Sequence, residues 1–314
     1  MKQELSKKTR TESDLIGSRE VPESALYGVQ TLRGIENFRI SKFHLNEYPL
    51  FIQALAITKM GAAIANRELD LLTKEQTDAI LKACKEILEG KYHDQFPVDM
   101  IQGGAGTTTN MNANEVIANR ALELMGHQRG EYQYCSPNDH VNRSQSTNDA
   151  YPTAIHIGLY YTHLKLVKHF ETLIQSFRKK GEEFANIIKM GRTQLEDAVP
   201  MTLGQTFNGF ASILEHEVKN LDFAAQDFLT VNMGATAIGT GITAEPGYAE
   251  KCIAALGKIT GLDIKLADDL IGATSDTSCM VGYSSAMKRV AVKMNKICND
   301  CLLYTSPSPR DRTR

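Results

Sequence analysis

Residues 151–188 read YPTAIHIGLYYTHLKLVKHFETLIQSFRKKGEEFANII, and this stretch decides the fold. Its apolar side chains recur every three or four residues, at Ile155, Leu159, Leu164, Val167, Phe170, Ile174 and Phe177. That spacing predicts an amphipathic helix, longer than most helices of globular proteins. Because a long apolar stripe needs other long helices beside it, the sequence predicts a mainly α-helical protein with an extended central bundle.

Several other segments show helical periodicity, whereas signals for strands are few after residue 150. Helices are expected over residues 50–69, from a capping box at 73–76 to Gly90, from about 110 to 126, from 202 to about 229, and from about 284 to 300. Residues 1–49 are polar and interrupted by glycine and proline, which predicts an N-terminal arm of short strands or turns. Helices therefore dominate the expected fold.

A polar stretch, SPNDHVNRSQSTNDAYP at residues 136–152, leads into the long helix and supplies hydroxyls, amides and carboxylates instead of a core. Its last polar residues, 146–149, occupy the N-cap region, where backbone N–H groups lack partners and the helix dipole is positive. Such a position attracts a carboxylate or a phosphate. One residue, Asn148 or Asp149, would be enough to cap the helix, so the run of polar residues favours a binding site over capping alone.

A second polar loop, QGGAGTTTNMNANE at residues 102–115, has glycines that permit close backbone approach. Its residues 107–110 offer hydroxyl and amide donors at another helix start. A dinucleotide-binding loop is not expected there, since no apolar strand precedes it. A third polar loop, GRTQLEDAVP at residues 191–200, separates the two long helices. The presence of several such loops in one chain strengthens the prediction of a site.

The composition argues against several kinds of partner and cofactor. The 314 residues carry 35 basic and 37 acidic side chains, so the net charge is −2, and no basic face for nucleic acid is predicted. No apolar run approaches the roughly twenty residues of a membrane span. The six cysteines show no disulfide framework and residues 1–8 no signal peptide, which predicts a cytoplasmic protein. No metal motif appears, and neither a metal nor another cofactor is expected.

Three motifs together resemble the aspartase/fumarase superfamily. They are GAGTTTNMNANEV at 104–116, SQSTND at 144–149 and GRTQLEDAVPMTLGQ at 191–205. The resemblance runs from about residue 12 to Asp300 and is greatest to the aspartate ammonia-lyases of that superfamily. It implies a mainly α-helical subunit whose long central helices assemble into the core of a homotetramer. It also implies active sites that are each built from loops of three subunits.

The activity that the resemblance implies is reversible elimination of ammonia from L-aspartate to give fumarate, through an enediolate intermediate. The motifs carry over five substrate-binding residues. Thr107, Ser146 and Thr147 would bind the β-carboxylate, while Asn148 and Thr193 would hold the amino group. Two further residues, Gln194 and His140, are possible supporting residues. Fumarases of the superfamily typically carry His at the position of Gln194, so an ammonia-lyase is favoured over a hydratase.

The resemblance divides the chain into an N-terminal domain at 1–143, a partial central helical bundle at 144–300 and a tail at 301–314. The general base of the family is a serine in a flexible loop some way beyond the position of Asp300, and this chain has no such loop. Residues from Cys301 onward resemble a translated sequencing adaptor, the alternative being a disordered native tail. The fold is therefore expected to stop before the C-terminal domain, and the chain as given is expected to be inactive.

Two other functions stay open. A class II fumarate hydratase would share the fold and add water instead of ammonia to fumarate, so that it would turn over malate and not aspartate. A non-catalytic helical assembly protein would have no need of the donor set at Thr107, Ser146, Thr147, Asn148 and Thr193, which argues against this alternative.

Overall fold

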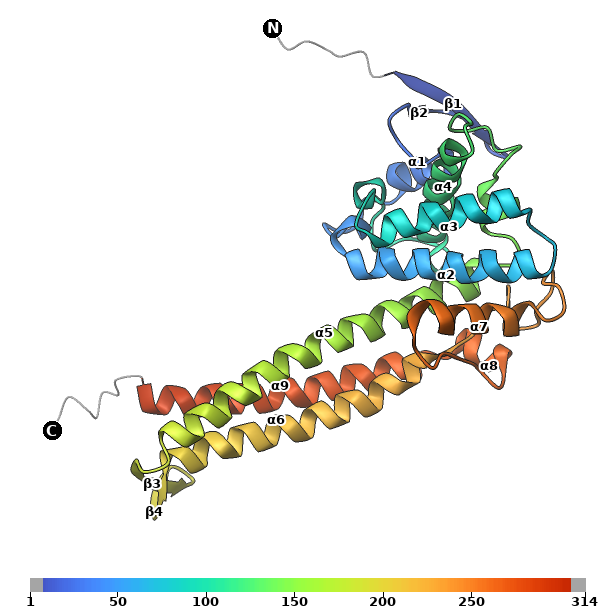
Figure 1. Ribbon diagram of the computed structural model, residues 1–314. Coiled ribbons are helices and arrows are strands. Elements are labelled where there is room, and N and C mark those ends of the chain that lie inside the picture. Colours follow the sequence, from blue (N-terminus) through green and yellow to red (C-terminus); the bar gives the residue numbers. More distant parts are fainter. Residues whose placement is uncertain (1–7, 306–314) are drawn as a thin grey trace, which may run out of the picture. The chain divides into compact units, whose positions relative to one another are not determined.

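The computed structural model describes residues 8–305, which form two compact units (Figure 1). Unit 1 comprises the chain up to Tyr161 together with Phe228–Asp276. Unit 2 comprises Thr162–Asp227 together with the chain from Thr277 onward. Helix α5 (Thr147–Glu183) begins in unit 1 and continues into unit 2.

Unit 1 contains one hairpin, several helices and a short parallel strand pair. The hairpin and first helices are β1 (Thr9–Asp14), β2 (Gly17–Pro22), α1 (Val29–Asn37), η1 (Leu45–Glu47), α2 (Pro49–Glu68) and α3 (Lys74–Leu88). Next come η2 (His93–Gln95), α4 (Thr107–Leu124), the π-helical turn η3 (Pro137–Val141) and the start of α5. The second segment adds β5 (Thr230–Val231), α7 (Tyr248–Thr260), β6 (Lys265–Leu266) and α8 (Leu270–Ser275).

The core of unit 1 lies around α2, which packs against α3 and α7, while α3 also packs against α4. Its fully buried side chains include Ile52, Leu55, Ile80, Ile117 and Leu256. Helices α2 and α7 approach closely at Gly61, where an added Cβ would lie 2.7 Å from Leu256 Cδ2. The apolar periodicity of residues 50–69 correctly predicted the buried helix, which runs over Pro49–Glu68.

The boundaries of α3 follow local signals that the sequence shows directly. The Gln76 N–H donates to Thr73 Oγ1 at 3.2 Å, and the Thr73 N–H donates back to Gln76 Oε1 at 3.1 Å. This is the predicted capping box. The helix ends at Leu88, and Gly90 follows with φ +87°, as expected for a glycine stop.

The N-terminal arm contains a helix that the sequence did not predict. Residues 9–22 form the antiparallel hairpin β1–β2, but Val29–Asn37 form α1. Gly28, its N-cap residue, offers no side chain to cap the helix. The missing acceptors come from Glu115 on α4, which accepts from the N–H groups of Gly28, Gln30 and Thr31. Because Glu115 is distant from Gly28 in the sequence, the residues around Gly28 do not show that a helix is capped there.

Unit 2 consists of the later part of α5, α6 (Leu203–Ala225), α9 (Ser278–Thr305) and a hairpin of β3 (Ile188–Thr193) with β4 (Glu196–Thr202). The turn η4 (Gln226–Leu229) follows α6. Helices α6 and α9 run side by side (Figure 1). Their contacts bury Phe210, Leu214 and Ile297 in one cluster and Leu221 and Val290 in another. The predicted extended helix is confirmed, since α5 is 37 residues long.

Two expectations for this region need correction. Residues 191–200 are not an irregular loop, because most of them pair in the β3–β4 hairpin. The last helix begins at Ser278 instead of 284 and continues to Thr305. His163 of α5 is buried between Asp222 of α6 and Tyr283 of α9, because both helices cover that turn of α5. The part of the expected tail at 306–314 lies outside the described residues. Within residues 8–305, no helix combines the length and the apolar character that crossing a bilayer requires.

Candidate active site

Two of the three predicted loops meet at the N-termini of α4 and α5 in unit 1. The Asn110 Nδ2–H of α4 donates to Thr147 Oγ1 of α5 at 3.2 Å. Gly106, the N-cap residue of α4, faces the Tyr151 ring so closely that an added Cβ would lie 2.5 Å from two ring carbons. Only glycine fits there, and it also adopts φ +90°. Two positive helix ends therefore lie next to each other, which favours an anionic ligand.

Thr107 is the first residue of α4 and is exposed. Its hydroxyl donates to the Gly104 carbonyl at 2.6 Å, in a turn where Gly104, Ala105 and Gly106 all have positive φ. Ala105 is strained there, since a residue with a Cβ rarely adopts this conformation. For Thr107 to donate to a ligand, its hydroxyl has to turn away from Gly104.

Ser146 and Asp149 cap helix α5 together. Ser146 Oγ accepts from the Asn148 N–H at 3.2 Å, while Asp149 Oδ1 accepts from the Ser146 N–H at 2.9 Å. Of the two single caps considered from the sequence, Asp149 therefore takes part and the Asn148 side chain does not. The Thr147 hydroxyl and the Asn148 side-chain amide take no part in this cap.

Asp149 and Asn148 also bind a glycine- and threonine-rich loop, residues 232–241, that the sequence interpretation did not assign to the site. Asp149 Oδ2 accepts from the N–H groups of Gly234 at 3.1 Å and Thr236 at 2.9 Å. Asn148 Nδ2 donates to the Ala237 carbonyl at 2.7 Å. Burial raises the pKa of Asp149 to about 6, against the hydrogen bonds that lower it. This loop therefore fixes the orientation of the Asn148 amide.

Lys59 lies fully buried next to the N-terminal turn of α4, where it contacts Asn110. It was not among the residues that the sequence predicted for the site. Its ammonium donates to Asn110 Oδ1 at 2.7 Å, Asn142 Oδ1 at 2.9 Å and Gln145 Oε1 at 2.9 Å. Burial lowers the pKa of Lys59 to about 7, while the charge of Asp149 opposes that shift. A lysine within the apolar run of α2 was the available signal, because a buried cation needs partners.

Thr193 and Gln194 belong to unit 2, whereas the other predicted substrate-binding residues belong to unit 1. Thr193 ends β3, and Gln194 and Leu195 form the tip of the hairpin with φ +50° and +68°. Next to the tip, Arg192 Nε donates to Asp197 Oδ1 at 3.1 Å. The hairpin therefore presents both predicted residues at an exposed turn.

His140 lies in the π-helical turn η3 of unit 1. Its Nδ1 accepts from the Ser136 N–H at 2.7 Å, so the neutral ring carries its proton on Nε2. Burial lowers the pKa of His140. Ser136 Oγ in turn donates to Asp139 Oδ2 at 2.9 Å. These bonds give His140 a role in holding the turn that leads to Asn142. Among residues 8–305, no three His, Cys, Asp or Glu side chains gather as ligands for a metal ion.

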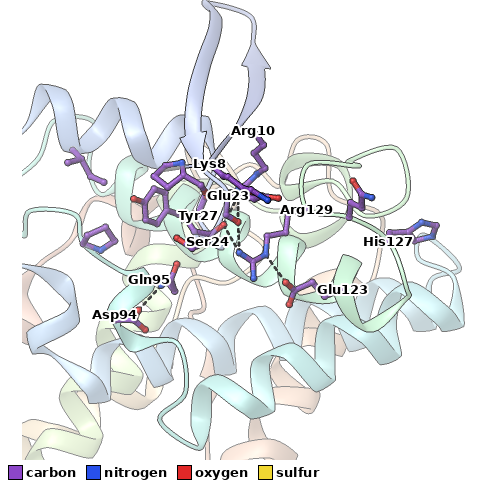
Figure 2. Close-up of a pocket in the computed structure, with 15 residues that line it drawn as sticks. Lys8, Arg10, Glu23, Ser24, Tyr27, Asp94, Gln95, Glu123, His127 and Arg129 are labelled. Atoms are coloured by element: carbon purple, nitrogen blue, oxygen red, sulfur yellow. Dashed lines mark hydrogen bonds and ion pairs between the residues drawn. The ribbon is translucent and has the colours of Figure 1, made fainter. Parts of the chain in front are cut away.

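A cavity of about 1090 Å³ opens elsewhere in unit 1, beside the base of the β1–β2 hairpin (Figure 2). Arg129 in its wall donates to Glu123 at 2.6 Å and to the Glu23 carbonyl at 2.8 Å. Arg10 likewise donates to the Ala25 carbonyl at 2.7 Å and the Tyr27 carbonyl at 2.8 Å. Since both guanidinium groups bind the protein itself and no motif residue lines this cavity, the motif loops remain the candidate active site.

Comparisons with known proteins agree with these observations. The profile of a family described as Lyase matches residues 17–310. An aspartate ammonia-lyase from Pseudomonas aeruginosa is 55% identical over 299 residues, covering 95% of this chain and 63% of that protein.

Solved structures share the fold. The fumarate lyase:delta crystallin of Brucella melitensis bound to cobalt has a TM-score of 0.92 and 48% identity, covering 96% of this chain and 65% of that chain. A class II fumarase from Schistosoma mansoni has a TM-score of 0.89 and 32% identity, and the match covers 96% of this chain and 67% of that chain. The predicted mainly α-helical fold of aspartase/fumarase type is thereby confirmed. The chain spans about 63% of the length of the curated relatives it matches.

Proposed function

The chain belongs to the lyase family, and from this premise we propose that its protein eliminates ammonia reversibly from L-aspartate to give fumarate. The observation that carries the proposal is the contact between Asn110 and Thr147, which joins two helix N-termini at the sequence motifs. A dicarboxylic substrate is the kind of ligand that such a pair of helix ends favours.

The proposed reaction removes the C3 proton of aspartate, and negative charge then develops on the β-carboxylate as an enediolate. Thr107, Ser146 and Thr147 are the proposed donors to that carboxylate. The positive ends of α4 and α5 and the buried charge of Lys59 add to the stabilisation. In this proposal these groups stabilise the transition state more than the substrate, because the charge on the β-carboxylate grows as the proton leaves. Loss of one such donor costs about 3 kcal/mol in the barrier.

Asn148 and Thr193 are the proposed ligands of the amino group. Because Asn148 Nδ2 already donates to the Ala237 carbonyl, its Oδ1 is the atom that would accept from the substrate ammonium. Thr193 stands on a hairpin with exposed apolar residues, including Ile188, Leu195 and Val199. We infer that this hairpin reaches the site of another copy in a homotetramer, with Gln194 in a supporting role.

The general base of the proposed reaction is a serine for which this chain has no counterpart motif. A cytoplasmic location is part of the proposal, since the spacing of the six cysteines in the sequence shows no disulfide framework.

The test is to read genomic DNA past the codon for Asp300, express the resulting protein, and follow fumarate absorbance after adding L-aspartate or L-malate. Release from aspartate alone is the expected result. Release from malate alone would establish the fumarate hydratase alternative, and release from neither would favour the helical assembly protein.

A variant connects the activity to the site. In the same protein, Thr147→Val removes one proposed donor while keeping the shape of the side chain. Its kcat/KM for aspartate is expected to fall by about 10²- to 10³-fold. An unchanged kcat/KM would show that the β-carboxylate does not bind at Thr147.

A further inference from the structure

The buried contacts of Lys59 determine which way the Asn110 amide faces. Lys59 Nζ donates to Asn110 Oδ1 at 2.7 Å, so the carbonyl oxygen of the Asn110 amide is the atom that faces Lys59. The Asn110 amide nitrogen is then turned toward α5. Both residues are about 1% exposed, so water does not compete for these bonds.

The Asn110 amide nitrogen has two hydrogens, and the structure gives both an acceptor. One acceptor is Thr147 Oγ1 at 3.2 Å, and the other is Asn142 Oδ1 at 3.2 Å. Asn142 Oδ1 is a carbonyl oxygen, which can only accept, and it also accepts from Lys59 at 2.9 Å. Thr147 Oγ1 therefore accepts a hydrogen bond from the Asn110 amide, and the hydrogen of the Thr147 hydroxyl has to point away from Asn110.

We propose that Asn110 is a positioning residue that directs the Thr147 hydroxyl hydrogen toward the bound carboxylate. This inference rests on the proposed function, because it takes the ligand of Thr147 to be a carboxylate. Asn110 does not touch the substrate in this arrangement. It sets the polarity of a hydrogen-bond chain that runs from Lys59 through Asn110 to Thr147 and the ligand.

The chain requires an amide at position 110. A carboxylate there would still accept from Lys59, but it would have no N–H to offer Thr147. The Thr147 hydroxyl would then donate to residue 110 and turn its hydrogen away from the ligand. Asn110→Asp is therefore a sharp test, because shape and the contact with Lys59 are kept while the hydrogen bond with Thr147 is reversed and the one to Asn142 Oδ1 is lost.

The experiment uses the full-length protein described above. Asn110→Asp is expected to lower kcat/KM for aspartate by about 10²-fold, approaching the loss in Thr147→Val. Asn46→Asp makes the same chemical change at an exposed position and is expected to leave kcat/KM unchanged. Wild-type kcat/KM in Asn110→Asp would overturn the proposal.

Asn110→Ala removes the donor without adding charge, and it allows a double-mutant cycle. If Asn110 acts through Thr147, the variant carrying both Asn110→Ala and Thr147→Val is expected to be no worse than Thr147→Val alone. If the two losses multiply instead, Asn110 acts independently of Thr147, and the proposal is wrong. A purely structural role would also give multiplying losses.

Binding of succinate, a dicarboxylate that cannot react, separates this inference from the proposed function. Calorimetry is expected to show a dissociation constant about tenfold higher in Asn110→Ala than in wild type. If wild type releases no fumarate from aspartate but this ratio holds, the proposed reaction fails and the positioning role stands. If wild type is an active lyase and the succinate ratio is one, the positioning role fails alone.

Discussion

Glu115 shows how a single residue connects distant parts of unit 1. It is buried on α4 and accepts from the N–H groups of Gly28, Gln30 and Thr31 and from the Thr31 hydroxyl, at 2.6–3.0 Å. Burial raises the pKa of Glu115 to about 7, against these hydrogen bonds. The residue that caps α1 therefore titrates near neutral pH.

We predict that the contribution of Glu115 to the free energy of unfolding falls as the pH rises from about 4 to 7. In that window the folded protein keeps a proton on Glu115, whereas the unfolded chain has lost it near its usual pKa of about 4.3. One proton corresponds to at most about 1.4 kcal/mol per pH unit. Urea unfolding at pH 5, 6 and 7 measures the slope.

The matched control for this pH dependence is Glu115→Gln, which cannot titrate. Its free energy of unfolding is expected to be lower at each pH because an amide accepts fewer of the four bonds, but to decline less steeply with pH. Parallel curves for wild type and Glu115→Gln would show that Glu115 keeps its usual pKa.

A second prediction at the residue scale concerns Gly106. Gly106→Ala forces a residue with a Cβ into a positive φ and places that Cβ against the Tyr151 ring. The expected loss in unfolding free energy is about 3 kcal/mol. Gly90→Ala is the control, since Gly90 has a similar φ of +87° and open space around it. Its expected loss is about 1 kcal/mol. Equal losses in urea unfolding would mean that the Gly106–Tyr151 contact does not hold the two loops together.

At the scale of elements, the β3–β4 hairpin is strained beside a proposed substrate-binding residue, Thr193. Its two-residue tip, Gln194 and Leu195, has positive φ at both positions, as a type I′ turn requires. Neither residue is a glycine or asparagine, the types that adopt this conformation readily. Strain of this kind is typical of functional turns, and the tip directly follows Thr193.

Leu195→Asn is expected to raise the unfolding free energy of the 314-residue chain by about 0.5–1 kcal/mol. Asparagine relieves the strain at positive φ, and little apolar burial is lost because Leu195 is 73% exposed. Val199→Asn on β4 introduces the same residue into a strand, where it should destabilise. Denaturant titration of both variants provides the measurement, and a destabilised Leu195→Asn would contradict the assigned turn.

At the scale of the whole molecule, unit 2 exposes apolar side chains on the outer faces of its helices. Phe223 of α6 is 83% exposed, and Val281 and Val292 of α9 are about 60% exposed. Large exposed apolar residues on neighbouring helices are typical of a surface that other chains cover. They support the proposed homotetramer.

Phe223→Asp in the full-length protein is therefore expected to convert tetramers into smaller species. A carboxylate in an apolar contact between subunits costs several kcal/mol. Light scattering coupled to gel filtration measures the mass. Lys74→Glu changes an exposed residue of α3 and is the control that should remain tetrameric. An unchanged mass for Phe223→Asp would place the contact between subunits elsewhere.

The sequence by itself predicted what depends on neighbours along the chain. The long helix α5, the capping box of α3 and the helix at 49–68 follow from periodicity and cap residues, which act within one or two turns. The motif loops that contain Thr107 and Thr147 were also identified from local patterns. The division of the chain at residues 143 and 300 stays a prediction.

Only the tertiary structure decided which distant groups meet. In the structure Asn110 contacts Thr147, Lys59 donates to Asn110, and Glu115 caps α1. The tertiary structure also turned residues 191–200 into a hairpin. Such contacts depend on burial, because a desolvated charge or an uncapped helix end needs a partner wherever the fold supplies one. The sequence around such a charge or helix end does not show which distant residue will be its partner.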